Sequence, residues 1–277
     1  MPKLAVVSLI QDDQPLNTMV DFAIEHSFQV VELMGKFHSA EMLSEEDLRY
    51  LERVSESNGI TFNQHYLHGA LPGSHRTSVW RDTLASFERN LEMVQRLGGR
   101  VIVLHPGKID VPTLARPEDG SELIRREAVR NLKRFVRSAA PTAEKLGITI
   151  CVENLKHDPG YVLSSYEDLA SVIDDADSDN VGVVLDVGHC IIGDGLSEAI
   201  NVLGDRIRHL HLNDAIDGVD HEEIGTGTLD LDEMAPLISS DMNIEFATLE
   251  VGKAPDSYGV ILRSREALRQ RYGDAVD

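Results

Sequence analysis

The chain has few cysteines, few lysines and no long apolar run, and each shortage argues against a class of protein. Its two cysteines, Cys151 and Cys190, lie in different strand-like segments, which argues against a disulfide framework. No window reaches the ~18 consecutive apolar residues of a transmembrane helix, and the N-terminal residues lack the apolar region and cleavage site of a signal peptide. We therefore predict a cytoplasmic protein with no membrane partner.

Positive charge is also scarce. The sequence holds 26 lysines and arginines against 47 aspartates and glutamates, a net charge of −21. Such a field repels nucleic acid, which disfavours a nucleic-acid partner without excluding one. Only seven of the basic residues are lysine. An acidic, lysine-poor surface fits a protein from a salt-rich cytoplasm, although simple drift from lysine to arginine would leave the same composition.

Strand-like and helix-like patterns alternate eight times along the sequence. The predicted strands are Leu4–Ile10, Gln29–Leu33, Ile60–His65, Val101–Leu104, 148–153, Val181–Asp186, Ile207–Leu212 and Ile244–Val251. The predicted helices are Leu16–His26, one that begins at Ser44, Ser78–Leu97, Ser121–Leu146, Tyr166–Asp174, Leu196–Leu203, Leu231–Ile238 and Gly259–Tyr272. This alternation predicts the α/β class, and the length fits one domain, 1–277, folded as a (β/α)8 TIM barrel. An open doubly wound sheet is the alternative, but no G-x-G-x-x-G turn follows an early strand.

Histidines or carboxylates stand at or near the ends of six predicted strands: His65, His105, Glu153, Asp186, His211 and Glu250. In a parallel barrel the carboxyl ends of the strands meet on one face, so these side chains should converge. A carboxylate that ends a buried strand is costly unless it is paired or binds a metal. Oxygen and nitrogen ligands without paired cysteines suit Mn²⁺, Mg²⁺, Co²⁺, Zn²⁺ or Fe²⁺. We therefore predict a divalent metal centre. His65 or His105 taken alone would more often be a hydrogen-bonded loop residue.

Six short motifs cover the later strands: H-P-G at 105–107, E-N at 153–154, L-D-V-G-H at 185–189, H-L-H-L-N-D at 209–214, H-E-E-I-G-T-G at 221–227 and E-V at 250–251. With these motifs the chain resembles the xylose-isomerase-like barrel superfamily, which includes sugar isomerases, sugar epimerases and the endonuclease IV type of abasic-site nuclease. The resemblance implies one divalent metal held by Glu153, Asp186, His211 and Glu250. It also implies that Glu153 and Glu250 transfer a proton on opposite sides of a sugar, sugar phosphate or sugar acid through a metal-stabilised enediolate. Barrels of this superfamily commonly pair, which implies a homo-oligomer.

The nuclease-like members offer an alternative, a metal-dependent phosphodiesterase that acts at abasic DNA. In them His65 and His105 would share a second metal with Glu153, and His189 and His221 would serve a third; in an isomerase these histidines would contact substrate instead. The nucleases place an aspartate two residues before the last histidine, where this chain has Val219. Asp220 is adjacent to His221, and neighbours on an extended segment point to opposite faces, so Asp220 would be a poor substitute unless the loop turns. A barrel that only binds a metabolite is a third alternative.

Glu32 and four lysines are the weaker candidates for substrate binding. Lys108, Lys156 and Lys253 each follow a candidate ligand by three residues, and Lys36 follows Glu32 by four. These lysines would form a positive rim for an anionic substrate, unless they are ordinary solvated loop residues. Glu32 would contact a substrate hydroxyl, with a salt-bridged carboxylate as the alternative. We expect His209 to face inward as a hydrogen-bond partner behind the ligands.

Overall fold

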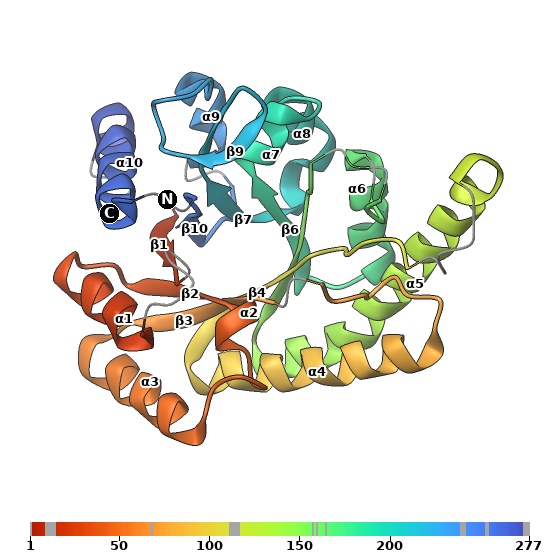
Figure 1. The fold of residues 1–277 in the computed structure, drawn as a ribbon, viewed down its shortest axis with the longest axis horizontal. Helices are drawn as coiled ribbons and strands as arrows, with labels where there is room; N and C mark the ends of the chain where they lie inside the picture. The colour runs from red at the N-terminus through yellow and green to blue at the C-terminus, as the bar shows by residue number, and fades with distance from the viewer. Residues whose placement is uncertain are drawn as a thin grey trace.

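The structure, a computed structural model, describes residues 2–8, 15–66, 69–110, 117–156, 158, 160–163, 165–238, 242–252 and 255–273; for 117–121 it describes the backbone alone. Its centre is a closed barrel of eight parallel strands in the order β1-β10-β7-β6-β5-β4-β3-β2 (Figure 1). The barrel strands are β1 (Lys3–Val7), β2 (Val30–Met34), β3 (Thr61–His65), β4 (Gly98–Leu104), β5 (Thr149–Glu153), β6 (Val181–Asp186), β7 (Ile207–Leu212) and β10 (Phe246–Leu249). The predicted TIM barrel is therefore confirmed.

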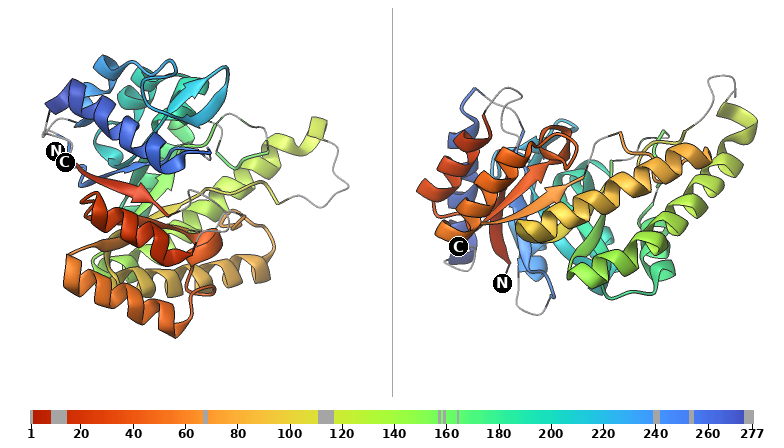
Figure 2. Two further views of the ribbon diagram at one scale, coloured as in Figure 1. Left: turned by 60° about the vertical axis from the view of Figure 1, so that its left-hand side comes forward. Right: turned by 90° about the horizontal axis from the view of Figure 1, so that it is seen from below.

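Helices surround the barrel on its outer face, as the two further views in Figure 2 show. They are α1 (Leu16–Glu25), α2 (Gly35–His38), α3 (Glu45–Asn58), α4 (Thr77–Arg96), α5 (Pro117–Leu146), α6 (Tyr166–Ala176), α7 (Val187–Ile192), α8 (Leu196–Leu203), α9 (Leu231–Ile238) and α10 (Ser257–Tyr272), with a 3-10 turn, η1 (Gly204–Arg206), before β7. Among the described residues, no helix is both long and apolar enough to cross a bilayer.

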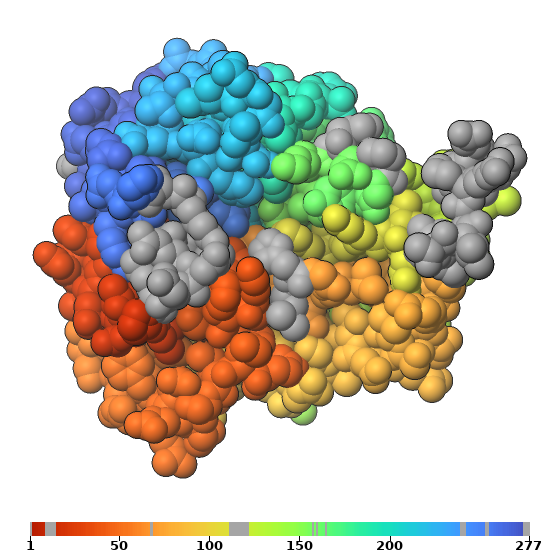
Figure 3. Space-filling model, in the orientation of Figure 1, coloured from red at the N-terminus to blue at the C-terminus, as the bar shows by residue number. Residues whose placement is uncertain are grey.

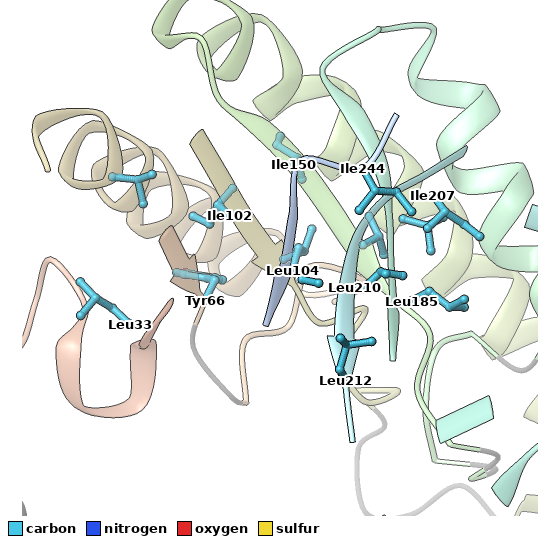
Figure 4. Packing of buried hydrophobic residues seen from close by; sticks show 14 of the residues in the cluster. Leu33, Tyr66, Ile102, Leu104, Ile150, Leu185, Ile207, Leu210, Leu212 and Ile244 are labelled. Carbon is cyan, nitrogen blue, oxygen red and sulfur yellow. The ribbon is translucent and has the colours of Figure 1, made fainter. Parts of the chain in front are cut away.

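Alternation along the strands separates two packing layers. Outward-facing residues such as Leu33, Ile102 and Leu210 are fully buried against the helices, and Figure 4 shows their side chains in this layer. Inward-facing Val103, Cys151 and their neighbours form a second, smaller cluster inside the barrel. The apolar inner cluster leaves the carboxyl ends of the strands for polar side chains. A side chain at the end of a strand on the inward parity therefore lies at the barrel mouth.

Local signals explain several element ends. The side chain of Ser44 caps α3, and Asp47 completes a capping box with it. Gly59 ends α3 in the left-handed region, at a φ of 70°, which glycine adopts without the steric penalty of a Cβ atom. The capping box matches the predicted start of this helix at Ser44.

The structure differs from the prediction mainly at the barrel mouth. α2 follows β2 directly, α7 follows β6 directly, and a hairpin of β8 (Asp214–Ile216) and β9 (Val219–Glu222) follows β7. None of these was predicted, because each is too short to give a periodic apolar pattern. Figure 3, in the orientation of Figure 1, shows the light-blue atoms of the segment around β9 at the top of this face. The first strand ends earlier than predicted. β1 ends at Val7, whereas the prediction extended to Ile10; residues 9 and 10 lie outside the described residues.

Candidate metal centre

Four predicted ligands meet at the barrel mouth. Glu153 and Asp186 are the last residues of β5 and β6, His211 is on β7, and Glu250 directly follows β10. Their relative exposures are 1%, 0%, 0% and 7%, respectively. One oxygen or nitrogen of each lies within 4.8 Å of those of the other three. The parallel pairing of Asp186 with His211 across β6 and β7 fixes their level in the barrel. The arrangement offers three carboxylates and one imidazole to a single cation.

A second group shares Glu153 with the first. His105 Nε2 lies 2.7 Å from Glu153 Oε2, and His65 Nε2 lies 3.3 Å from the same oxygen. The two histidine Nε2 atoms are themselves 2.8 Å apart. The other oxygen of Glu153, Oε1, lies 3.6 Å from His211 Nδ1 in the first group. Glu153 therefore presents one oxygen to each group, as a bridging ligand would.

Asp220 lies beside two histidines. Its Oδ2 lies 3.3 Å from His189 Nε2, and its Oδ1 lies 3.4 Å from His221 Nδ1. The loop turns here because His221 has a left-handed backbone, with a φ of 63°, so the condition under which Asp220 could substitute is met. This conformation breaks the two-residue alternation of an extended strand. Ligand atoms of Asp186, His189 and His221 also lie within 4.8 Å of one another, which makes a third group.

Two asparagines, which the sequence analysis did not single out, hold this third group in place. Asn213 Nδ2 donates to Asp186 Oδ2 at 3.1 Å, and Asn213 Oδ1 accepts from the backbone N–H of His221 at 3.1 Å. Asn154 Oδ1 accepts from the backbone N–H of Asp186 at 2.7 Å, and the Asn154 carbonyl lies 2.9 Å from His189 Nδ1. The only sequence signal for them was their place inside the E-N and H-L-H-L-N-D motifs.

Opposite charges keep the buried groups ionised. Burial alone would lower the pKa of His65, but the nearby carboxylates of Glu250, Glu153 and Glu32 raise this pKa to about 10. Burial raises the pKa of Glu250, but the charges of His211 and His65 outweigh it and lower this pKa to about 2. Without a cation, protonated imidazoles therefore neutralise the carboxylates.

The donor set fits a divalent cation. Among the described residues, Glu153 Oε2, His211 Nδ1 and Glu250 Oε2 are buried and make no hydrogen bond of acceptable geometry. His211 Nδ1 and Glu250 Oε2 nevertheless lie 2.7 Å apart. Buried polar atoms normally have a hydrogen-bond partner, so atoms that converge without one indicate a missing ligand. Carboxylate oxygens and imidazole nitrogens are the ligands that Mn²⁺, Zn²⁺, Co²⁺ and Fe²⁺ take in proteins.

Glu32 lies below the centre rather than beside a substrate. Its side chain is 0% exposed, so it offers no surface to a substrate hydroxyl. His211 Nε2 is 3.1 Å from Glu32 Oε1, and His209 Nε2 is 2.9 Å from Glu32 Oε2. The hydroxyl of Thr248 donates to Oε2 at 2.8 Å. The alternative of a paired carboxylate therefore describes Glu32 better than the predicted substrate contact, and His209 faces inward as expected.

The described lysines of the predicted rim differ in their contacts. Lys156 Nζ lies 3.3 Å from Asp220 Oδ2, and Lys156 lines a cavity of about 310 Å³ at the mouth together with His105, Glu153, His221 and Glu250. Lys108 Nζ lies 5.7 Å from the centre of the Tyr161 ring, and Lys36 Nζ lies 4.8 Å from that of Phe37. Lys253 lies outside the described residues. Of the described lysines Lys36, Lys108 and Lys156, Lys156 lines this cavity.

The glycine-rich loop after β9 is held by a carboxylate of the chain itself. Asp214 Oδ2 accepts from the backbone N–H groups of Gly225 and Gly227 at 3.0 and 2.9 Å. A Cβ atom at position 227 would lie 2.4 Å from Asp214 Oδ1, so this approach requires glycine. Because Asp214 takes these two amides, the loop does not present them to a phosphate group.

Comparison with known proteins gives similarities over most of the chain. A sequence model of the family described as xylose isomerase-like TIM barrel matches residues 20–270. A solved D-tagatose 3-epimerase-like protein superposes with a TM-score of 0.78 at 25% identity, over 97% of this chain and 96% of that one. D-psicose 3-epimerase of Enterocloster bolteae is 35% identical over 91 residues, which are 32% of this chain and 29% of that protein. A probable endonuclease 4 of Thermotoga maritima is 23% identical over 223 residues, 73% of each protein.

Proposed function

The chain belongs to the xylose isomerase-like TIM barrel family, and from this premise we propose that it is a divalent-metal-dependent isomerase or epimerase of a sugar, sugar phosphate or sugar acid. One observation carries the proposal. Glu153 and Glu250 extend from β5 and β10, which are three strands apart around the barrel, and both reach the same group of ligand atoms. Two carboxylates that approach one point from different sides suit the removal of a proton from one face of a carbon and its return to the other.

The residues that would bind the cation include those that would transfer the proton. Glu153, Asp186, His211 and Glu250 would hold the cation, which supplies a Lewis acid for a carbonyl oxygen. Glu153 accepts the proton from the carbon beside that carbonyl, and Glu250 returns one from the other side. Neighbouring imidazoles hold the pKa of each carboxyl well below its usual range despite burial, so both begin ionised.

The mouth of the barrel fits a small polar substrate. The cavity of about 310 Å³ is at the small end of ligand pockets, and its wall is rich in charged and hydrogen-bonding side chains. His105, His189 and His221 all line this cavity, and the last two would contact substrate hydroxyls there. The names of the D-tagatose and D-psicose 3-epimerase relatives support a ketose as the substrate class.

The test is the exchange of a substrate proton with solvent. Protein loaded with Mn²⁺, Co²⁺, Zn²⁺ or Mg²⁺ is incubated in D₂O with a panel of ketoses, ketose phosphates and sugar acids, and deuterium incorporation is measured by NMR. We expect incorporation that is abolished by chelation and lowered at least about 100-fold by Glu153→Gln or Glu250→Gln. Glu245→Gln is the matched control, because Glu245 is an exposed carboxylate paired with Arg100, and this variant should keep full activity. No incorporation with any substrate would refute the proposal.

The third group favours one second candidate, a phosphodiesterase that acts at abasic DNA. Asp220 reaches His189 and His221 although the aspartate spacing of the nucleases is missing, and the chain aligns with a probable endonuclease 4. The net charge of −21 opposes binding to DNA, although a salt-adapted nuclease would be acidic too. Cleavage of a duplex oligonucleotide with one abasic site, by the same metal-loaded preparation, decides between the two activities.

A further inference from the structure

We propose that Glu32 is a positioning residue shared by the first two cation groups, and that it couples them so that filling one raises the affinity of the other. The inference rests on the cation binding proposed above. It adds that the two cation sites influence each other through Glu32, which contacts the side of the histidine rings that faces away from the cations.

One oxygen of Glu32 faces a histidine from each group. Oε1 lies 3.1 Å from His211 Nε2 and 3.4 Å from His65 Nδ1. The opposite nitrogen of each ring faces the cation ligands, because His211 Nδ1 lies 2.7 Å from Glu250 Oε2 and His65 Nε2 lies 3.3 Å from Glu153 Oε2. Each ring therefore spans the distance between Glu32 and one cation group.

The other oxygen anchors the carboxylate to the barrel interior. Oε2 accepts from the Thr248 hydroxyl at 2.8 Å and lies 2.9 Å from His209 Nε2. The second nitrogen of His209 lies 2.9 Å from the carbonyl oxygen of Phe246, which fixes the ring to the backbone. Glu32, His209, His211 and Thr248 are each 0% exposed, and His65 is 1% exposed. Bulk solvent therefore does not reach the carboxylate, and the four neighbouring side chains determine how it is oriented.

The contact at Oε1 is close but poorly aimed. Among the described residues, neither Glu32 Oε1 nor His211 Nε2 makes a hydrogen bond of acceptable geometry, although they are 3.1 Å apart. A carboxylate oxygen has two lone pairs and can accept from both rings once they are aligned. A histidine that ligates a cation through one nitrogen donates its other N–H to a partner that fixes the ring.

Coupling follows from this shared acceptor. Ligation at His211 would turn its Nε2–H toward Oε1 and so orient the carboxylate that His65 also faces. The second cation would then bind to side chains that are already partly ordered, so these side chains would lose less conformational freedom when it binds. Coupling of this kind typically changes affinity by about 5- to 150-fold, and it acts equally in both directions. Glu153, which touches both groups directly, remains in place when Glu32 is changed.

A binding cycle with four proteins tests the coupling without any sugar. Metal-free wild type, Glu32→Gln, His105→Asn and the double variant are titrated with Co²⁺, and binding is followed by visible absorption and calorimetry. His105→Asn disables the second group and so measures the first alone. We expect two bound Co²⁺ per chain in wild type and a loss of about 10- to 100-fold in affinity in Glu32→Gln. We expect a clearly smaller loss when Glu32→Gln is added to His105→Asn.

Thr248→Val is the matched control, because it alters the same buried pocket at Oε2 and leaves Oε1 to the two rings. We expect it to change the affinities less than Glu32→Gln does. Should Glu32→Gln fail to fold by circular dichroism, the double variant Thr248→Val/His209→Asn removes both partners of Glu32 Oε2 instead and should reduce the coupling. Unchanged coupling in that variant would overturn the proposal.

Other outcomes separate this inference from the proposed function. An equal loss from Glu32→Gln with and without His105 would mean that Glu32 orients each ring independently, and it would overturn the coupling. One bound Co²⁺ per wild-type chain would overturn it too, while a single-cation epimerase would survive. Coupled binding of two cations without deuterium exchange would refute the epimerase and support the coupling.

Discussion

Gly188→Ala tests how the fold holds the third group of ligands. Gly188 lies in α7, between the strand end that carries Asp186 and the side chain of His189. A Cβ atom at position 188 would lie 1.8 Å from Asn213 Oδ1 and 2.9 Å from Asn213 Cγ. Asn213 would have to move by more than an ångström. Its hydrogen bonds to Asp186 and to the backbone of His221 would then break.

Two effects oppose each other in this variant, and their sizes decide the sign. Alanine is favoured over glycine inside a helix by about 1 kcal/mol. Against this, a buried hydrogen bond to a charged group contributes about 1.5–3 kcal/mol and a neutral one about 1 kcal/mol. We therefore expect a net loss of about 2 kcal/mol, which lowers the melting temperature of a chain of this size by about 4–8 °C. Because Asp186 also belongs to the first cation group, cation affinity should fall by about 10- to 100-fold.

Urea unfolding of the metal-free protein and Co²⁺ titration measure the two effects separately. The double variant Gly188→Ala/Asn213→Ser supplies the control, since the shorter serine removes the clash together with the hydrogen bonds. In the Asn213→Ser background we expect Gly188→Ala to cost almost nothing. A Gly188→Ala protein as stable as wild type, with the same Co²⁺ affinity, would refute the reasoning that Asn213 positions Asp186.

Three further predictions follow from charges outside the ligand groups. Burial lowers the pKa of His38 from its usual 6.5 to about 4, despite the opposing charge of Asp47. As the pH falls, the unfolded chain therefore binds this proton before the folded chain does. Wild type should lose about 3 kcal/mol of stability between pH 6.5 and 4. His38→Asn should lack that loss in urea titrations across this pH range. Lys156→Ala should change stability by less than about 1 kcal/mol, because the lysine of this ion pair with Asp220 is half exposed. A raised KM for sugar phosphates, with an unchanged KM for neutral ketoses, would support a role of Lys156 in anion binding. An unchanged KM for both substrates would exclude that role. The excess of acidic residues predicts that molar KCl raises the melting temperature, whereas equal stability at low salt would rule out salt adaptation.

The sequence predicted what depends on local pattern. Alternation of strand and helix patterns along the chain indicated the barrel and put Glu153, Asp186, His211 and Glu250 at or near strand ends. Those positions need no knowledge of distant residues, because every strand of a parallel barrel runs toward the same mouth. Local capping signals correctly placed the start of α3.

It failed where a side chain depends on partners from distant strands. In the sequence V-V-E-L-M, Glu32 resembles an ordinary acid near a strand end, and its hydrogen-bond partner His209 lies 177 positions later. The sequence left the position of Asp220 open because it depends on one left-handed residue, His221, which carries no glycine or asparagine as a signal. Both residues lie on the functional face, where local preference yields to the arrangement of charges.

The charges at the mouth also determine what removal of a bound cation would do to the fold. Several buried carboxylates would destabilise the barrel if they were unpaired, since breaking one buried pair costs about 3–5 kcal/mol. Here the imidazoles can carry the compensating charge: nearby carboxylates outweigh burial and raise the pKa of His189 to about 10 and that of His221 to about 9. Protons can therefore replace a cation electrostatically, and the apolar layers between the strands and the helices do not depend on the ligands. A small zinc domain unfolds when its metal is removed because it has no such core. This barrel should stay folded in chelator, so a loss of exchange activity on chelation would report on the chemistry of the centre rather than on unfolding.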